Sequence, residues 1–151
     1  MDQEKFKEII DFAIRSEQEA VYFYQNLQKM SSFQNQKDIM REFELMEKGH
    51  IEILKKIDIA SGTDSSKIPN VANLSISEFL VEVPAKPDMD YQDVLIIAMK
   101  REENALKLYE KLAAESDTDE IKTLFTRLAA EEAKHKHHFE KIYDDDILTE
   151  N

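Results

Sequence analysis

Hydrophobic positions recur at alternating steps of three and four in four long segments of the chain, at roughly residues 3–30, 34–59, 90–115 and 118–143. This spacing keeps one face of an α-helix apolar, so it predicts four amphipathic helices. Only "SSFQN" separates the first two segments, and "ESDTDE" separates the last two. In the latter, Asp117 with Glu120 three residues later predicts a capping box that opens the fourth helix. Because connections this short join antiparallel neighbours, we expect two helix hairpins.

The segment between the hairpins, at about residues 60–89, contains all three prolines of the chain. A helix of about 26 residues is roughly 40 Å long, and about 30 extended residues cover that distance. The pattern therefore predicts a long crossover in an all-α, ferritin-like four-helix bundle. Within the crossover, "ISEFLVE" fits either a short helix or a strand-like strip, and the pattern does not choose between them.

The two halves of the chain are weakly repeated. A shift of 85 residues places "AIRSEQEAVYFYQNL" on "AMKREENALKLYEKL" with five identities. The same shift places Glu47 on Glu132 and His50 on His135 without a gap. Two similar hairpins are expected to pack about a pseudo-two-fold axis.

Each of the four apolar seams is interrupted near its middle by a polar residue. The interruptions are a glutamate in each seam and, three residues later in the second and fourth seams, a histidine: Glu17, Glu47, His50, Glu102, Glu132 and His135. Their distances from the two turns are matched, so all six side chains are expected to converge at the middle of the bundle. The Glu-x-x-His spacing places both side chains on one helix face.

Four carboxylates cannot share a dry core unaided, because desolvation and mutual repulsion would cost many kcal/mol or raise their pKa values. Two divalent cations would cancel the four charges, and each imidazole would add one nitrogen ligand. This ligand set is the pattern of di-iron and di-manganese carboxylate bundles. Oxygen-rich ligands favour iron or manganese over structural zinc, and the sequence does not choose between those two. In the opposing interpretation, the acids are solvated boundary residues, but two equivalent Glu-x-x-His motifs in core positions favour a metal.

Four other residues attract a chemical interpretation. Tyr24 and Tyr109 lie two turns after their glutamates. Each is either a core tyrosine whose hydroxyl forms its hydrogen bond elsewhere, or a tyrosine that donates a hydrogen bond across the bundle to a metal-ligand side chain. His137 lies off the seam and His138 corresponds to an isoleucine, so both are assigned to surface or boundary packing.

Composition narrows the class of protein. The 151 residues predict a single domain, 1–151, and two glycines with 34% charged residues favour an all-helical one. A formal charge of -12 argues against nucleic-acid and anionic-membrane partners. The absence of cysteine excludes disulfides, thiolate nucleophiles and cysteine-ligated metals. The charged, amphipathic start and the lack of an 18-residue apolar stretch predict a cytoplasmic protein.

The motifs "AIRSEQEAVYFY", "MEKGH", "REENALKLY" and "EEAKH" together resemble the rubrerythrin branch of the ferritin-like superfamily over nearly the whole chain. The resemblance implies a site of two iron ions. It assigns the roles in three pairs, with terminal ligands Glu17 and Glu102, bridging carboxylates Glu47 and Glu132, and nitrogen ligands His50 and His135.

Two departures from the family pattern affect the expected chemistry. The cysteine-ligated, rubredoxin-like domain of rubrerythrins has no counterpart here, so we expect a separate electron donor, such as a rubredoxin-like or flavin protein. Ala105 stands where the family places an additional glutamate that takes part in redox-linked ligand exchange. The remaining six-ligand set is symmetrical and closer to that of bacterioferritin. Glu103 lies about 100° round the helix and is a poor substitute.

Three functions follow as hypotheses. The first is a di-iron oxidoreductase of oxidative-stress defence that reduces hydrogen peroxide or dioxygen. For this protein we expect a homodimer, in which the hairpins either close within one chain or swap between the two chains. The second is a ferroxidase or iron-binding protein without peroxide turnover. The third is a metal-free helical module whose acids serve partner recognition.

Overall fold

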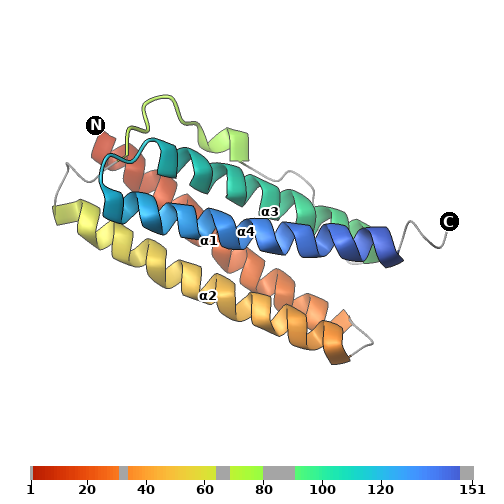
Figure 1. Cartoon of the computed structure of the whole chain (residues 1–151). Coiled ribbons are helices and arrows are strands. Elements are labelled where there is room, and N and C mark those ends of the chain that lie inside the picture. Colours follow the sequence, from red (N-terminus) through yellow and green to blue (C-terminus); the bar gives the residue numbers. More distant parts are fainter. Residues whose placement is uncertain (1, 31–33, 64–68, 80–90, 147–151) are drawn as a thin grey trace.

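The computed structural model describes residues 2–30, 34–63, 69–79 and 91–146 (Figure 1). These residues form four long α-helices and one short 3-10 helix: α1 (Asp2–Met30), α2 (Gln34–Thr63), η2 (Ile76–Phe79), α3 (Tyr91–Ala114) and α4 (Asp119–Asp146). The predicted all-α four-helix bundle is confirmed. The observed helix ends lie within about four residues of the predicted ones, which is ordinary for boundaries read from periodicity.

The helices pack as two antiparallel hairpins, α1 with α2 and α3 with α4, and α2 also contacts α4 (Figure 1). Apolar side chains fill both ends of the bundle. One hydrophobic cluster includes Ile10, Leu54 and Phe125, and the other includes Leu27 and Phe139. Each such side chain stabilises the fold by about 1.5–3 kcal/mol when fully buried. The polar middle of the bundle is therefore enclosed between two dry ends.

The start of α4 differs from the predicted one by one residue. The Lys122 N–H donates to the Thr118 carbonyl at 3.1 Å, and the helix begins at Asp119. The residue that accepts this first helical hydrogen bond occupies the capping position. The capping position is therefore held by Thr118 and not Asp117, and Thr118 Oγ1 has no hydrogen-bond partner among the described residues.

Residues 70–72 of the crossover are held against one end of the bundle. Lys5 Nζ donates to the Ala72 carbonyl at 2.8 Å, and the Asn70 N–H donates to the Glu115 carbonyl at 3.2 Å. Within "ISEFLVE", the first four residues form η2, and Asn104 Nδ2 donates to the Phe79 carbonyl at 3.3 Å. The short helix thereby lies against α3. Of the predicted crossover, residues 60–63 instead continue α2, and residues 64–68 and 80–89 lie outside the described residues.

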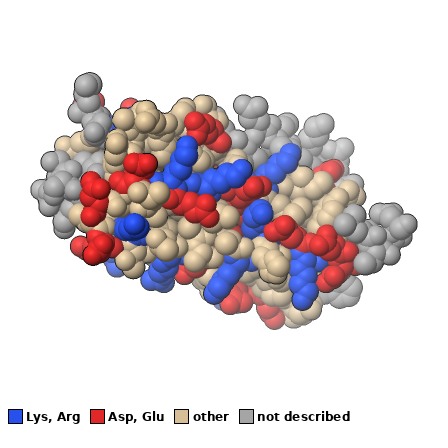
Figure 2. All heavy atoms as spheres, turned by 45° about the horizontal axis from the view of Figure 1, so that its top comes forward, with Lys and Arg blue, Asp and Glu red and all other residues tan. Residues whose placement is uncertain are grey.

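Charged side chains of both signs cover the exposed helix faces. On the face shown in Figure 2, lysines and arginines lie among aspartates and glutamates rather than gathering by sign. Some pair within one helix, as Lys7 does with Asp11 at 3.7 Å. Exposed pairs of this kind contribute about 0.3–0.5 kcal/mol each, so they do not determine the fold. Among the helices that the structure describes, none is long and apolar enough to cross a membrane.

Candidate metal centre

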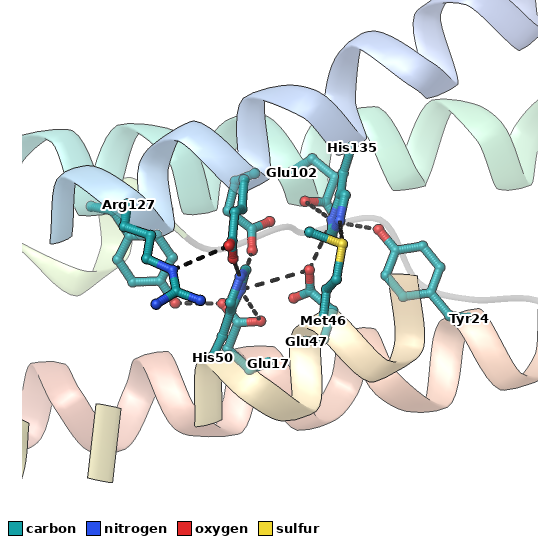
Figure 3. A network of polar contacts seen from close by, with 11 residues as sticks. Glu17, Tyr24, Met46, Glu47, His50, Glu102, Arg127 and His135 are labelled. Atoms are coloured by element: carbon teal, nitrogen blue, oxygen red, sulfur yellow. Dashed lines mark hydrogen bonds and ion pairs between the residues drawn. The ribbon is translucent and has the colours of Figure 1, made fainter. Parts of the chain in front are cut away.

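The six polar residues of the seams lie together in the middle of the bundle. Figure 3 shows the cluster, to which α1 and α3 each give one glutamate, whereas α2 and α4 each give a glutamate and a histidine. No residue of the set is more than 2% exposed: Glu17, Glu47, His50, Glu102, Glu132 and His135. The structure therefore brings together all six residues singled out from the sequence, from both hairpins of one chain.

The donor atoms of these residues form two overlapping sets of four, in each of which all atoms lie within 4.8 Å of one another. One set is Glu17, Glu47, His50 and Glu132, and the other is Glu47, Glu102, Glu132 and His135. Glu47 and Glu132 belong to both sets. Two adjacent positions with two shared carboxylates could hold a pair of cations.

One donor atom of each residue is buried without a hydrogen-bond partner among the described residues: Glu17 Oε2, Glu47 Oε1, His50 Nδ1, Glu102 Oε2, Glu132 Oε1 and His135 Nδ1. These atoms crowd one another, since His50 Nδ1 lies 2.8 Å from Glu132 Oε1 and His135 Nδ1 lies 2.9 Å from Glu47 Oε1. Buried polar atoms without partners are costly and rare in folded proteins. Four carboxylate oxygens and two imidazole nitrogens fit a pair of iron or manganese ions.

The electrostatics of the cluster also favour a pair of divalent ions at this site. Burial, followed by the repulsion of neighbouring carboxylates, raises the pKa of Glu47 and of Glu132 well above the ordinary 4.5. The two shared glutamates of the metal-free cluster therefore hold their protons to higher pH than exposed glutamates do. Two divalent cations would supply the positive charge that lets these carboxylates ionise without repulsion.

Two tyrosines fix the outer oxygens of the unshared glutamates. The Tyr24 hydroxyl on α1 donates to Glu102 Oε1 on α3, and the Tyr109 hydroxyl on α3 donates to Glu17 Oε1 on α1. Of the two alternatives open from the sequence, the geometry is that of donors across the bundle. Burial, with the nearby carboxylates, raises the pKa of both tyrosines well above 10.0, so each hydroxyl stays a donor.

Two residues behind the histidines were not identified from the sequence. His50 Nε2 bonds to Glu131 Oε2, and Glu131 Oε1 also accepts from Arg127 Nε at 3.3 Å. His135 Nε2 instead lies 3.4 Å from Met46 Sδ (Figure 3). Glu131 and Met46 each directly precede a shared glutamate in the sequence. This adjacency was the signal by which the sequence could have pointed to them as contacts of the histidines.

A cavity of about 310 Å³ reaches the cluster from the side of α1 and α3. Its lining includes the four glutamates of the cluster, together with Ala20, Ala105 and Phe79. Ala105 thus lines the cavity, and a longer side chain at this position would project into it. Glu103 points elsewhere, since its carboxylate is 43% exposed and pairs with Lys107 at 3.4 Å. As expected from its position on the helix, Glu103 does not replace the missing glutamate.

The remaining histidines of α4 belong to neither set of donor atoms. His137 is exposed, and His138 is half-buried with its ring edge-on to Phe43 at 5.2 Å. Both positions agree with the surface and boundary packing predicted for them.

Comparison with known proteins identifies the family. The sequence model of the family described as Rubrerythrin matches residues 8–143, which include all six residues of the cluster. Neither the curated proteins nor the solved structures gave a match. The chain therefore belongs to the rubrerythrin family.

Proposed function

We propose that this protein is a non-haem di-iron oxidoreductase that reduces hydrogen peroxide with electrons from a separate donor protein. The observation that carries the proposal is the pair of overlapping donor sets with Glu47 and Glu132 in common. Such sharing would hold two metal ions next to each other, and adjacent ions can act together on one small molecule. Membership in the rubrerythrin family supports iron as the metal.

The protein side of the reaction can be assigned to particular residues. His50 and His135 present Nδ1 to the cluster, and the two tyrosines hold Glu17 and Glu102 with one oxygen of each turned inward. When bound, two ferrous ions would supply the two electrons that, with two protons, convert one hydrogen peroxide molecule into two waters.

Access is provided by the cavity between α1 and α3. Its volume of about 310 Å³ is ample for a molecule as small as peroxide, and its lining includes carboxylates of the cluster. Along the bundle axis, the two hydrophobic clusters close the site on both sides. A small neutral oxidant therefore suits the site better than a bulky substrate.

A ferroxidase or iron-binding role without peroxide turnover is the second candidate. Ala105 favours this second candidate. Because residue 105 is an alanine, α3 adds no further carboxylate to the cavity, and the cluster keeps six donors in two matched sets. Both candidates require the same metal pair. They differ in whether electrons from a donor return the centre to its reduced state after oxidation.

Stopped-flow oxidation of the reduced, iron-loaded protein separates the two candidates. A peroxidase is expected to be oxidised faster by hydrogen peroxide than by air-saturated buffer, and to turn over when a reductant is added. Glu103→Gln, which alters an exposed acid close to the cluster in sequence, is the control and should behave as the wild type. Equal rates with the two oxidants and no turnover would reject the peroxidase in favour of the ferroxidase.

A further inference from the structure

The two histidines of the cluster differ in what lies behind them. Glu131 contacts His50, and Met46 contacts His135, in each case through Nε2 of the ring. Met46 and Glu131 are equivalent residues, since the shift of 85 residues places one on the other. The repeat therefore puts a carboxylate and a thioether in matching positions.

The carboxylate holds its histidine more firmly than the thioether does. A carboxylate accepts a strong, charge-assisted hydrogen bond from an imidazole N–H, whereas a thioether sulfur is a weak acceptor. Such a bond orients the ring and makes its other nitrogen a better metal ligand. His50 Nδ1 is consequently the better prepared of the two nitrogen donors.

Glu131 is itself held in place. Arg127 Nε donates to it at 3.3 Å from one turn earlier on α4, and the Glu131 side chain is only 21% exposed. The residue equivalent to Arg127 in the first hairpin is Glu42, which is exposed. Neither the carboxylate nor its supporting cation is thus repeated behind His135.

His135 is positioned mainly by packing. Its ring lies 4.1 Å from the Phe43 ring, measured between centroids. The residue equivalent to Phe43 in the second hairpin is Leu128. Packing against an aromatic ring restrains orientation but does not increase the electron density on the ligand nitrogen.

The rest of the cluster is matched between the two positions. Each has one tyrosine-bonded glutamate, and both have the shared pair Glu47 and Glu132. The difference between the two metal positions therefore lies largely in the residues behind the histidines.

We propose that the two metal positions are unequal. The position formed by Glu17, Glu47, His50 and Glu132 binds its divalent ion more tightly and fills first. The position formed by Glu47, Glu102, Glu132 and His135 is the weaker and releases its ion first. Loss of a hydrogen-bond partner behind a metal-binding histidine typically costs about 10–100-fold in metal affinity, and we expect a difference of that size. This inference rests on the metal-binding part of the proposed function but not on peroxide turnover.

Cobalt(II) titration of the metal-free protein tests the inference without any catalytic assay. Calorimetry and the visible absorption of bound cobalt should resolve two steps that differ about 10–100-fold in affinity. Crystals grown with one equivalent of cobalt should give an anomalous peak beside His50. Glu131→Gln should weaken the first step until the two steps merge. Glu140→Gln, at an exposed acid of α4 that pairs with Lys136, is the matched control and should leave both steps unchanged.

The reciprocal variant gives an independent test. Met46→Glu places a carboxylate behind His135 and should strengthen the second step while the first stays as it was. Circular dichroism of each metal-free variant checks that the helices are retained. Two equal steps in the wild type, or a first step unaffected by Glu131→Gln, would overturn the inference while leaving the metal pair intact. Failure to bind any cobalt(II) or iron(II) would overturn both this inference and the proposed function.

Discussion

The Tyr109 hydroxyl donates a hydrogen bond to Glu17 Oε1 across the bundle, from the second hairpin to the first. Tyr24 makes the equivalent bond to Glu102 in the opposite direction. The two bonds tie the hairpins together at the level of the cluster. They also leave one oxygen of each glutamate, Oε2, without a hydrogen-bond partner among the described residues.

Replacing Tyr109 with phenylalanine should destabilise the metal-free protein by about 1–3 kcal/mol, because a buried carboxylate oxygen loses its donor. Urea unfolding in the presence of a chelator measures this change. Tyr24→Phe should have an effect of similar size. Tyr22→Phe alters a side chain that is 67% exposed on the same helix as Tyr24, and it should change the unfolding free energy little. An equal effect of Tyr22→Phe and Tyr24→Phe would contradict the role of the buried hydroxyls.

Metal content should distinguish the shared glutamates from the unshared ones. Glu47 belongs to both donor sets, whereas Glu17 belongs to one. Glu47→Gln should therefore reduce the binding of both ions, and Glu17→Gln should reduce the binding of one. Elemental analysis after reconstitution with iron(II) and gel filtration measures the stoichiometry. Loss of both ions in each variant, or of neither, would be inconsistent with a shared pair.

The metal-free protein should lose stability as the pH rises from about 4.5 towards neutrality. The pKa values of Glu47 and Glu132 are raised in the folded chain by burial and by neighbouring carboxylates. Their contribution to folding is therefore fully present below the unfolded-state pKa of 4.5 and is lost as the pH rises through the folded-state values. The free energy of unfolding changes by about 1.4 kcal/mol per pH unit for each such group across that window.

Urea unfolding with a chelator at a series of pH values checks this dependence. The double variant Glu47→Gln, Glu132→Gln should show a smaller fall with pH than the wild type and should be the more stable protein near neutrality. Saturating iron(II) under anaerobic conditions should instead stabilise the wild type, by about 2.7 kcal/mol at a free metal concentration 100 times Kd. Parallel pH profiles for the wild type and the double variant would show that these two glutamates are not the cause.

Filling the cavity should slow oxidation without removing the metal. Ala105→Leu places a larger apolar side chain in the space that borders the four carboxylates. We expect the rate of oxidation by hydrogen peroxide to fall about tenfold, which corresponds to about 1.4 kcal/mol of activation free energy. Ala114→Leu, at an exposed position on the same helix, is the control. An unchanged rate in Ala105→Leu, at full iron content, would show that the oxidant enters elsewhere.

The helices and the cluster were predictable because they depend on periodicity. The seam positions and the repeat placed Glu47 and His50 in the core of the bundle with their counterparts, and the structure has them there. Whether Tyr24 donates within the cluster depends on the distance between α1 and α3, which periodicity does not fix. The contact between Glu131 and His50 depends likewise on how α4 is rotated against α2, because Glu131 lies beside the seam rather than on it.

The most direct test of the metal pair is an anaerobic crystal structure of the iron(II)-loaded protein with anomalous scattering at the iron edge. Two peaks are expected, one within the set that contains His50 and one within the set that contains His135. Glu47 and Glu132 should each contact both ions. A single peak, or iron bound outside the six-residue cluster, would contradict the account.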